Sequence, residues 1–571
     1  MCRRVLTSFE LPTHNAGREI KDMIDNLKRI EASTHTPVYM MHKFWARRPW
    51  KVFRTLIETF TNEGDVILDP FAGGGVTLVE GLIARRKVIA VDLNPLAVKI
   101  MYHEVAPLDI REYRGALSSL KEKLSRLMDE LYAVKCPLCN WQGVAEWVEY
   151  DRKTGEALIV QFKCPKGHRG RKKPEPIDLP RPPRINLSNR VKIPAGDKTS
   201  ELLESGYKYF DELYTPRNLA AIHYLREAIN SCKTSEEVKS FLQFTLSSTL
   251  KWASKMSHRR GKIIEGWAMH AYWIYPRYLE INVWHQFLRR ANAIIRGKEY
   301  TNKYINGYAV RGESFDELKR GKATYMILNT DSRKLPIPDG EVEAIITDPP
   351  YGGNVNYAEL SDYFLWLDSE LSPKNSEIVI NKTRGFTLEH YRKGLATVFR
   401  ECHRVLRENG LFISTFNSKD LRVVAAFLSA LKTSGFDYIG VSYQPYLKGY
   451  ETTFHAMQVD ALPFDFIFFF EKSDSNKSGN EAVIDSHVLL KEVRLMLSQE
   501  MERCIKEELT EKDYRVRTYP AMISALNSLD SSSSRLIAHY YEDIIKKNEG
   551  YFSKMRNKII EIRRNNSKNN R

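Results

Sequence analysis

The sequence lacks any apolar run of the roughly 18 residues that a membrane-spanning helix requires. Its start, Met-Cys-Arg-Arg, leads into mixed polar sequence without the apolar core of a signal peptide. Cysteines are few, and their number, seven, is odd, which argues against a disulfide framework and favours reduced thiols or metal ligands. We therefore expect a cytoplasmic protein without a membrane partner.

Acidic residues are scarce relative to basic ones. The 571 residues include 87 Lys and Arg against 71 Asp and Glu, which gives a formal net charge of +16. A charge of this sign favours a polyanionic partner such as nucleic acid, although it can also serve solubility. A chain of this length is too long for one hydrophobic core, so we expect several domains.

A candidate cofactor loop begins after the apolar strand expected near residues 66–68. The sequence continues as Asp-Pro-Phe-Ala-Gly-Gly-Gly-Val-Thr, and an apolar helix follows. Glycines let the backbone approach a ligand, and the helix N-terminus presents free N–H groups. The loop lacks the Gly-Lys-Ser/Thr ending of a P-loop and Asp69 would repel a phosphate, so an adenosine with a zwitterionic amino-acid tail suits it better. The next strand ends in Asp92, which can accept both ribose hydroxyls. Alone, this loop could also serve NAD.

The second informative stretch, residues 345–353, reads Ile-Ile-Thr-Asp-Pro-Pro-Tyr-Gly-Gly. The two prolines fix the backbone, so the Asp348 carboxylate, the Pro349 carbonyl and the Tyr351 ring keep one arrangement at a strand's carboxyl end. The carboxylate and the carbonyl can each accept one N–H of an exocyclic amine, which leaves the nitrogen lone pair free to attack an electrophile, while the ring can stack on a base. A plain Pro-rich turn is the alternative. Together with the glycine loop, this elbow indicates S-adenosylmethionine and methyl transfer.

Two further stretches complete the candidate site. Residues 42–50 interleave aromatic and basic side chains, which could cover a purine or hold a carboxylate, or could form a basic face anchored by buried tryptophans. The strand expected over residues 325–331 ends in Asp331, which could bind the cofactor or could be only a turn residue.

These motifs resemble those of the amino-methyltransferases that modify exocyclic amines of DNA bases. Asp-Pro-Phe-x-Gly-x-Gly, Asp-x-Asn-Pro and Asp-Pro-Pro-Tyr carry the resemblance, which covers most of residues 38–472. His-Lys-Phe-Trp-Ala-Arg-Arg-Pro and Asp-Pro-Pro-Tyr-Gly-Gly-Asn-Val-Asn-Tyr-Ala-Glu-Leu are most similar to adenine-specific DNA methylases that contain a zinc ribbon. One departure is Gly-Gly-Gly where many relatives have Gly-Ser-Gly, which should be harmless at such a turn.

The resemblance implies an α/β fold, a doubly wound (Rossmann-like) class I methyltransferase sheet. It implies that the cofactor is bound by Lys43, Asp69, Pro70, Phe71, Gly73, Gly75, Thr77, Asp92, Asn94 and Asp331. It implies that catalysis depends on Asp348, Pro349, Pro350 and Tyr351.

Four candidate metal ligands, Cys136, Cys139, Cys164 and His168, flank a segment that alternates as two short strands around residues 151–155. Two ligand pairs that flank a hairpin are typical of a zinc ribbon, here with three thiolates and one imidazole. The second pair is irregular, so the fourth ligand is His168 or lies elsewhere, and a ribbon that has lost its metal is the alternative. Bound zinc would be structural, because methyl transfer to an amine needs no Lewis acid.

The motifs divide the chain into five expected regions. These are an N-terminal helix (16–32) with the cofactor-binding half of the methyltransferase domain (1–110), the zinc ribbon (133–175), a mainly helical insertion for target recognition (176–320), the catalytic half (321–472) and a helical, basic C-terminal extension (473–571) that opens with a polar linker. The basic, proline-rich stretch 169–200 is interpreted as a linker or as an extended arm along DNA phosphates. The basic run 251–262 is interpreted as a DNA contact, with a solvated helix face as the alternative.

The sequence therefore predicts a DNA methyltransferase that flips its target base out of double-stranded DNA and methylates an exocyclic amine, N6 of adenine. N4 of cytosine fits the same geometry, and an RNA base methyltransferase or a non-catalytic DNA-binding protein stays open. A covalent cysteine route is excluded, because no Pro-Cys pair follows a strand in the catalytic half. A partner in restriction or defence is also left open.

Overall fold

The computed structural model describes residues 35–445, 464–473, 486–528 and 531–569, apart from 184, 186, 188 and 189, together with residues 20, 22–24 and 27. Most of the helix predicted over residues 16–32, and nearly all of the linker predicted after residue 472, lie outside these residues. Within the described part, no helix combines the length and the apolar character needed to cross a membrane.

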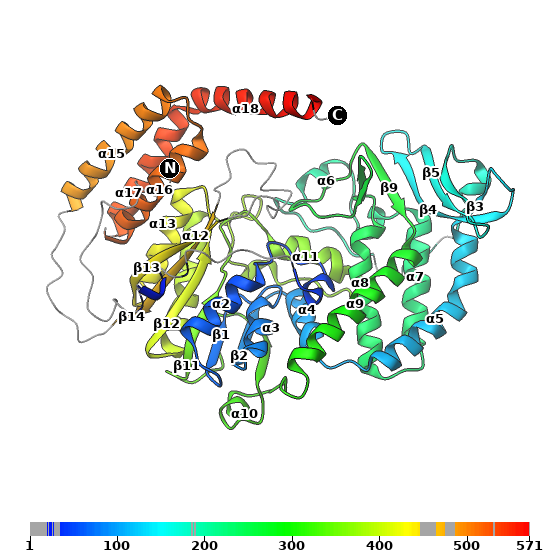
Figure 1. The fold of residues 1–571 in the computed structure, drawn as a ribbon, viewed down its shortest axis with the longest axis horizontal. Coiled ribbons are helices and arrows are strands. Elements are labelled where there is room, and N and C mark those ends of the chain that lie inside the picture. The colour runs from blue at the N-terminus through cyan, green and yellow to red at the C-terminus, as the bar shows by residue number, and fades with distance from the viewer. Residues whose placement is uncertain are drawn as a thin grey trace.

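A seven-stranded sheet lies at the centre of the molecule (Figure 1). Its strands are β1 (Val66–Asp69), β2 (Lys87–Asp92), β10 (Tyr325–Asn329), β11 (Val342–Thr347), β12 (Leu406–Phe416), β13 (Phe436–Pro445) and β14 (Phe464–Lys472). Their spatial order is β10-β2-β1-β11-β12-β14-β13. All neighbours are parallel except that β14 runs antiparallel to both β12 and β13. This arrangement confirms the predicted doubly wound α/β sheet of a class I methyltransferase.

Helices cover both faces of this sheet. They are α2 (Trp50–Phe60), α3 (Val76–Ile83), α4 (Pro95–Val105), α10 (Phe315–Lys319), α11 (Tyr357–Leu365), α12 (Leu388–Val405) and α13 (Leu421–Lys432). Successive strand residues point to opposite faces, so Ile67 packs in the cluster that includes α3 and α4, whereas Leu68 packs in the cluster that includes α12 and α13. All four residues of β1 are buried, which explains its uninterrupted apolar sequence before Asp69.

The strands that carry the motifs are neighbours. β1 pairs in parallel with β2 on one side and with β11 on the other. Since parallel strands end at the same edge, Asp69, Asp92 and Asp348 come together there, at the point where the chain order of the strands reverses.

The chain between β2 and β10 forms a helical bundle and a small sheet. The helices are α5 (Ile110–Leu131), α6 (Ser200–Glu204), α7 (Pro216–Asn230), α8 (Glu236–Ala253) and α9 (Val283–Ile305), and the strands are β3 (Ala133–Lys135), β4 (Gln142–Asp151), β5 (Ala157–Lys163), β6 (Arg169–Lys172), β7 (His258–Arg260), β8 (Ile263–Glu265) and β9 (Arg277–Ile281). The expected hairpin around residues 151–155 is formed by β4 and β5.

The expected boundary between ribbon and helical insertion differs from the structure. β9, from within the insertion, pairs with β4 of the ribbon and buries Leu279 and Ile281 against Trp147. The ribbon is therefore one sheet with part of the insertion, and β7 and β8 form a separate strand pair, so the insertion is not purely helical.

Four helices end the chain, and short 3-10 helices connect the other elements. The helices are α15 (Ser486–Lys506), α16 (Glu511–Ser528), α17 (Ser531–Lys547) and α18 (Glu549–Asn569), and the 3-10 helices are η2 (Pro37–Met40), η3 (Pro176–Asp178), η4 (Phe210–Leu213), η5 (Trp366–Asp368) and η6 (Lys374–Ser376). In Figure 1 α16 and α17 lie beside α13, whereas α18 extends from them toward the side of the molecule that carries the insertion.

Candidate functional site

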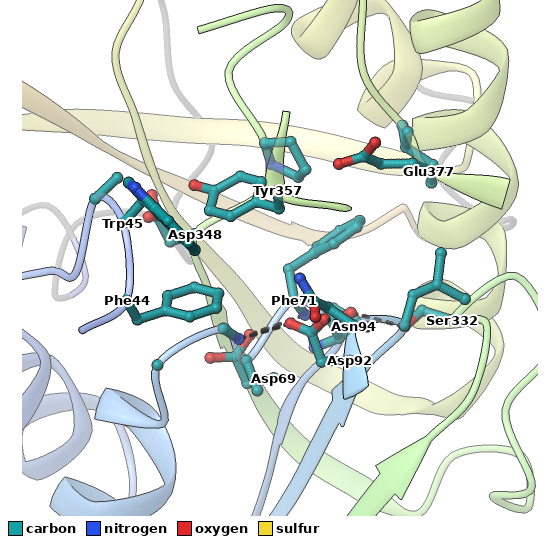
Figure 2. Close-up of a pocket in the computed structure, with 18 of the residues that line it drawn as sticks. Phe44, Trp45, Asp69, Phe71, Asp92, Asn94, Ser332, Asp348, Tyr357 and Glu377 are labelled. Carbon is teal, nitrogen blue, oxygen red and sulfur yellow. Dashed lines mark hydrogen bonds between the residues drawn. The ribbon is translucent and has the colours of Figure 1, made fainter. Parts of the chain in front are cut away.

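A cleft of about 1010 Å³, its open mouth included, lies at the carboxyl ends of β1, β2, β10 and β11 (Figure 2). The predicted site residues that line it are Asp69, Pro70, Phe71, Gly73, Thr77, Asp92, Asn94, Asp331, Asp348 and Pro350. Lys43, Gly75, Pro349 and Tyr351 do not line it. The structure thus gathers predicted residues from four separate sequence motifs around one cavity.

The glycine loop is shaped by the side chains packed against it as well as by the cleft. Gly73 has φ +48° and Gly75, the N-cap of α3, has φ +76°, so both adopt left-handed backbone that favours glycine. A Cβ at Gly74 would lie 2.6 Å from Nε of Arg47, and one at Gly73 would lie 3.0 Å from the Phe44 ring. The close approach of Arg47 explains why this chain has glycine where the resembled family has serine.

Asp92 and Asp69 have different surroundings. Each Asp92 carboxylate oxygen accepts one backbone N–H at 2.8 Å, from Gly73 and from Asn94, and burial raises the pKa of Asp92 to about 6. Asp69 accepts the hydroxyls of Thr77 (2.5 Å) and Thr347 (2.6 Å), and burial raises its pKa to about 7. Asp69 therefore connects β1 to α3 and β11 through its hydrogen bonds, whereas Asp92 stabilises the glycine loop.

Two other predicted residues are engaged by their own neighbours. Asn94 caps α4 by accepting the N–H of Leu96 (3.0 Å) and donates to the Ser361 hydroxyl (2.6 Å). Asp331 accepts Nη2 of Arg333 at 2.6 Å. Burial alone would raise the pKa of Asp331, but the hydrogen bonds from Arg333 outweigh burial and lower it. Asp331 is thus an ionised carboxylate at the rim of the cleft.

The Asp348 carboxylate accepts three protein donors. Its Oδ1 accepts the hydroxyls of Thr415 (2.6 Å) and Tyr351, and its Oδ2 accepts Nε of Arg48 at 2.7 Å. The Arg48 guanidinium also lies 4.7 Å from the centre of the Tyr351 ring. The Tyr391 hydroxyl on α12 donates to the Pro350 carbonyl at 2.6 Å, which stabilises the elbow.

Aromatic side chains form a wall of the cleft. Phe44 and Tyr357 are stacked, with ring centres 5.6 Å apart and an 18° interplanar angle, and Figure 2 shows both beside Asp348. Glu377 also lines the cleft, and burial raises its pKa to about 7. Neither Phe44 nor Glu377 was singled out from sequence, although Phe44 lies in the aromatic and basic stretch.

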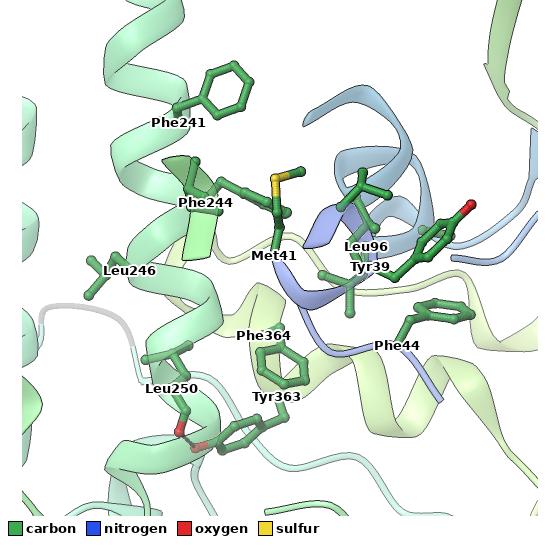
Figure 3. Packing of buried hydrophobic residues seen from close by; sticks show 14 of the residues in the cluster. Tyr39, Met41, Phe44, Leu96, Phe241, Phe244, Leu246, Leu250, Tyr363 and Phe364 are labelled. Atoms are coloured by element: carbon green, nitrogen blue, oxygen red, sulfur yellow. Dashed lines mark hydrogen bonds between the residues drawn. The ribbon is translucent and has the colours of Figure 1, made fainter. Parts of the chain in front are cut away.

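That stretch is fixed by the packing of the chain before it. The His42 ring stacks on Phe244 of α8 with centres 5.0 Å apart and meets Phe364 of α11 edge-on at 4.9 Å. Figure 3 shows Met41 near Phe244 of α8, and Phe44 further along the same segment. The segment thereby anchors Arg47 and Arg48 at the cleft and turns Lys43 elsewhere.

Lys43 lies in a basic environment outside the cleft. Burial, followed by the positive charges of Lys251 and Arg47, lowers the pKa of Lys43 to about 7. Arg47, which sequence reasoning did not separate from its neighbours, lines the cleft instead. The only signal available was the clustering of basic residues in the stretch.

The four candidate metal ligands converge as the spacing predicts. The Sγ and ring nitrogen atoms of Cys136, Cys139, Cys164 and His168 all lie within 4.8 Å of one another. Sγ of Cys139 is 3.5 Å from Sγ of Cys164 and 3.3 Å from Nδ1 of His168. A tetrahedron around zinc, with bonds of about 2.0–2.3 Å, has edges of about 3.3–3.8 Å. The donors and their separations therefore fit a tetrahedral zinc ion.

Comparison with known proteins identifies relatives among the methyltransferases. Residues 11–103 match a family model of N6/N4 DNA methylases, described as DNA methylase. The chain is 23% identical over 427 residues to the type II methyltransferase M.MjaII of Methanocaldococcus jannaschii, a match that covers 69% of this chain and 74% of that protein.

Solved structures give weaker likenesses. A Thermus thermophilus protein described as a DNA modification methylase is 16% identical with a TM-score of 0.17, and the match covers 28% of this chain and 59% of that one. Geranyl diphosphate methyltransferase in complex with SAM is 12% identical with a TM-score of 0.15, covering 31% and 73%. The chain thus spans under two thirds of the Thermus protein, and the fold assignment rests on strand order rather than on these scores.

Proposed function

We propose, from the premise that this chain carries a DNA methylase domain, that it transfers a methyl group from S-adenosylmethionine to N6 of adenine in double-stranded DNA. The observation that carries the proposal is the Asp348 carboxylate in the same cleft as Asp92. One edge of the sheet thus holds an acceptor for an amine beside an acceptor for ribose hydroxyls.

The cleft suits an adenosine with an amino-acid tail. Asp92 would accept the ribose hydroxyls, and Asp331 at the rim would accept an adenine N–H. Arg47 has buried Nε and Nη2 atoms without a hydrogen-bond partner, although Nη2 lies 3.0 Å from a Glu104 oxygen. These donors suit the carboxylate of the tail better than Lys43 does. When bound, S-adenosylmethionine supplies a methyl group already activated by its sulfonium.

The chain's own part in the reaction is to hold the amine. Asp348 and the Pro349 carbonyl would each accept one N–H of the flipped base, so that the nitrogen lone pair faces the methyl group and most of the rate comes from positioning. Asp348 then takes the proton that the amine releases. Flipping costs a few kcal/mol, and stacking on Tyr351 returns about 1–3 kcal/mol. Asp rather than Ser before Pro-Pro-Tyr favours adenine over cytosine.

The ribbon is proposed to hold one structural zinc ion through Cys136, Cys139, Cys164 and His168. The Lys166 N–H lies 3.4 Å from Sγ of Cys164, in the place of a donor to a metal-bound thiolate. The ion would stabilise the hairpin that joins the insertion and would take no part in methyl transfer.

The insertion is proposed to contact the DNA backbone. A second cleft is lined by Trp252 and by Arg289, Arg290 and Arg296 of α9. Within the described part of the chain, none of these arginines pairs with a carboxylate within 4.0 Å. Cations without acidic partners, placed beside an aromatic ring, suit phosphates and unstacked bases.

The test is transfer of tritium from methyl-labelled S-adenosylmethionine to genomic DNA and, separately, to total RNA. We expect label in DNA, and its loss in Asp348→Ala with cofactor binding retained. Asp316→Ala, which changes an exposed acid on α10, is the control. Label in RNA alone, or bound cofactor without transfer to any substrate, would overturn the proposal.

A further inference from the structure

Arg48 occupies the place that the target base needs. Its Nε donates to Oδ2 of Asp348 and its Nη1 donates to Oδ2 of Asp465, both at 2.7 Å. Its guanidinium lies over the Tyr351 ring, 4.7 Å from the centre. Arg48 lines the cleft together with Asp348, whereas Asp465, on β14, does not.

The Arg48 guanidinium shares two chemical features with the base that would displace it. It is planar, it presents N–H donors at its edge, and it stacks on aromatic rings. An adenine with an exocyclic amine offers the same two features to the same two partners, the Asp348 carboxylate and the Tyr351 face. Arg48 and a flipped base therefore compete for one position.

Oδ2 is the oxygen over which they compete. Oδ1 of Asp348 already accepts the hydroxyls of Thr415 and Tyr351, which belong to the fixed frame of the elbow. Oδ2 keeps a second lone pair beside the Arg48 Nε, but the guanidinium lies over the Tyr351 ring, so a base that stacks on that ring and donates to Oδ2 must displace it.

Asp465 offers Arg48 a second anchor. Its side chain is 2% exposed, and its other oxygen accepts Nδ2 of Asn417 at 2.7 Å, which holds the carboxylate in place. Burial opposes protonation, but Asp348 and Asp465 outweigh it and raise the pKa of Arg48. The side chain therefore remains charged and can turn on its Asp465 contact without leaving the protein.

We infer that Arg48 is a placeholder for the target base, which gives up Asp348 and keeps Asp465 when the base enters. This inference rests on the proposed function. Arg48 makes base entry a displacement, so a base that cannot satisfy Asp348 and Tyr351 does not open the site. Arg48 is thus a specificity-determining residue beside the catalytic carboxylate.

The test is equilibrium dialysis of radiolabelled 2′-deoxyadenosine against the full chain saturated with S-adenosylhomocysteine. We expect Arg48→Met to bind the nucleoside about tenfold more tightly than wild type, the worth of one charge-assisted hydrogen bond. Asp465→Asn should bind it more weakly, because Arg48 then has only Asp348. The double variant should behave as Arg48→Met, and it also removes the charge of Asp465, which Arg48→Met alone leaves buried without its cation.

Arg404→Met, which removes an ion pair with Glu401 away from the cleft, is the matched control and should bind as wild type does. Tm of every variant is measured beside its affinity. Equal, weaker or absent binding by Arg48→Met would overturn the inference, as would additive losses in the double variant. Failure of wild type to methylate DNA would overturn the proposed function instead, and the dialysis result does not depend on it.

Discussion

Asp92 and Asp69 end neighbouring strands and are both buried, yet they differ in what remains available to a ligand. Three donors converge on Asp69, from Thr77, Thr347 and the Phe71 N–H. Asp92 accepts one N–H on each oxygen and so keeps acceptor capacity on both. We therefore expect the affinity for the cofactor to depend on the charge of Asp92 rather than on that of Asp69.

The affinity for S-adenosylmethionine should depend on pH through Asp92. Its pKa, raised to about 6, means that the carboxylate is ionised above that pH and accepts the ribose hydroxyls. As pH falls through 6 the protonated form accepts them poorly, so Kd should rise, while Asp92→Asn should show a Kd about tenfold higher that lacks the rise centred on pH 6. Calorimetry from pH 5 to 8 measures both. A wild-type Kd that does not change below pH 6 would contradict this role.

Gly74→Ala should weaken cofactor binding without changing the sheet. Its Cβ would lie 2.6 Å from Arg47 Nε, so the guanidinium must shift from the place where it would meet the carboxylate of the tail. We expect a rise in Kd of about tenfold by calorimetry, the worth of one charge-assisted hydrogen bond. Gly115→Ala on α5, where a Cβ meets nothing within 4 Å, is the control. Unchanged affinity in Gly74→Ala would show that Arg47 takes no part.

At the level of single residues, the sequence located the acids but not the cations. Asp69, Asp92 and Asp348 follow apolar strands, and strand ends at one edge meet by topology alone. Lys43, Arg47 and Arg48 lie in an irregular segment whose side-chain directions are set by the packing of Met41 on α9 and of His42 on α8. No periodicity in sequence reports such directions.

At the level of elements, the ribbon shows what ligand spacing can and cannot predict. Cys136 and Cys139 occupy the turn between β3 and β4, and Cys164 and His168 occupy the turn between β5 and β6. The spacing predicts this convergence, because the two strands of a hairpin bring the residues before the first strand close to those after the second. It does not predict β9, which joins the sheet from residues distant in sequence. A boundary after residue 175 therefore does not separate the ribbon from the insertion.

Zinc removal should destabilise the ribbon and spare methyl transfer. We expect one zinc per chain by atomic spectrometry, and a Tm lowered by several degrees in Cys164→Ser, since metal binding contributes to folding free energy. Cys232→Ser, which changes a thiol outside the cluster, should keep both zinc and Tm. A full complement of zinc in Cys164→Ser would contradict the assigned ligands.

At the scale of the whole molecule, the cleft at the sheet edge and the arginines of α9 belong to separate parts of the chain. The segment before the glycine loop contacts both. Arg290 donates to the carbonyls of Met40 and Met41, directly before the stretch that lines the cleft. The proposed backbone contact and the proposed catalytic site are thus linked through one short piece of chain. The net charge of +16 favours a polyanionic partner but does not predict this placement.

Arg289→Gln with Arg296→Gln should weaken DNA binding uniformly across sequences. Each arginine that contacts a phosphate adds about 0.9 to the slope of log affinity against log salt, so the double variant should lower that slope by about two. Fluorescence anisotropy over a salt series measures it. Arg126→Gln, on the exposed face of α5, is the matched control and should leave the slope unchanged. An unchanged slope in the double variant would place the backbone contact elsewhere.

The central claim, methylation of an exocyclic amine held by Asp348, is tested most directly by the identity of the modified nucleoside. DNA methylated by the purified chain is digested to nucleosides and analysed by mass spectrometry, beside DNA treated with Asp348→Ala. The account predicts N6-methyladenine with wild type and none with the variant. N4-methylcytosine would keep the mechanism and change the base, whereas a ring-carbon methylation, or a product unaffected by Asp348→Ala, would contradict the account.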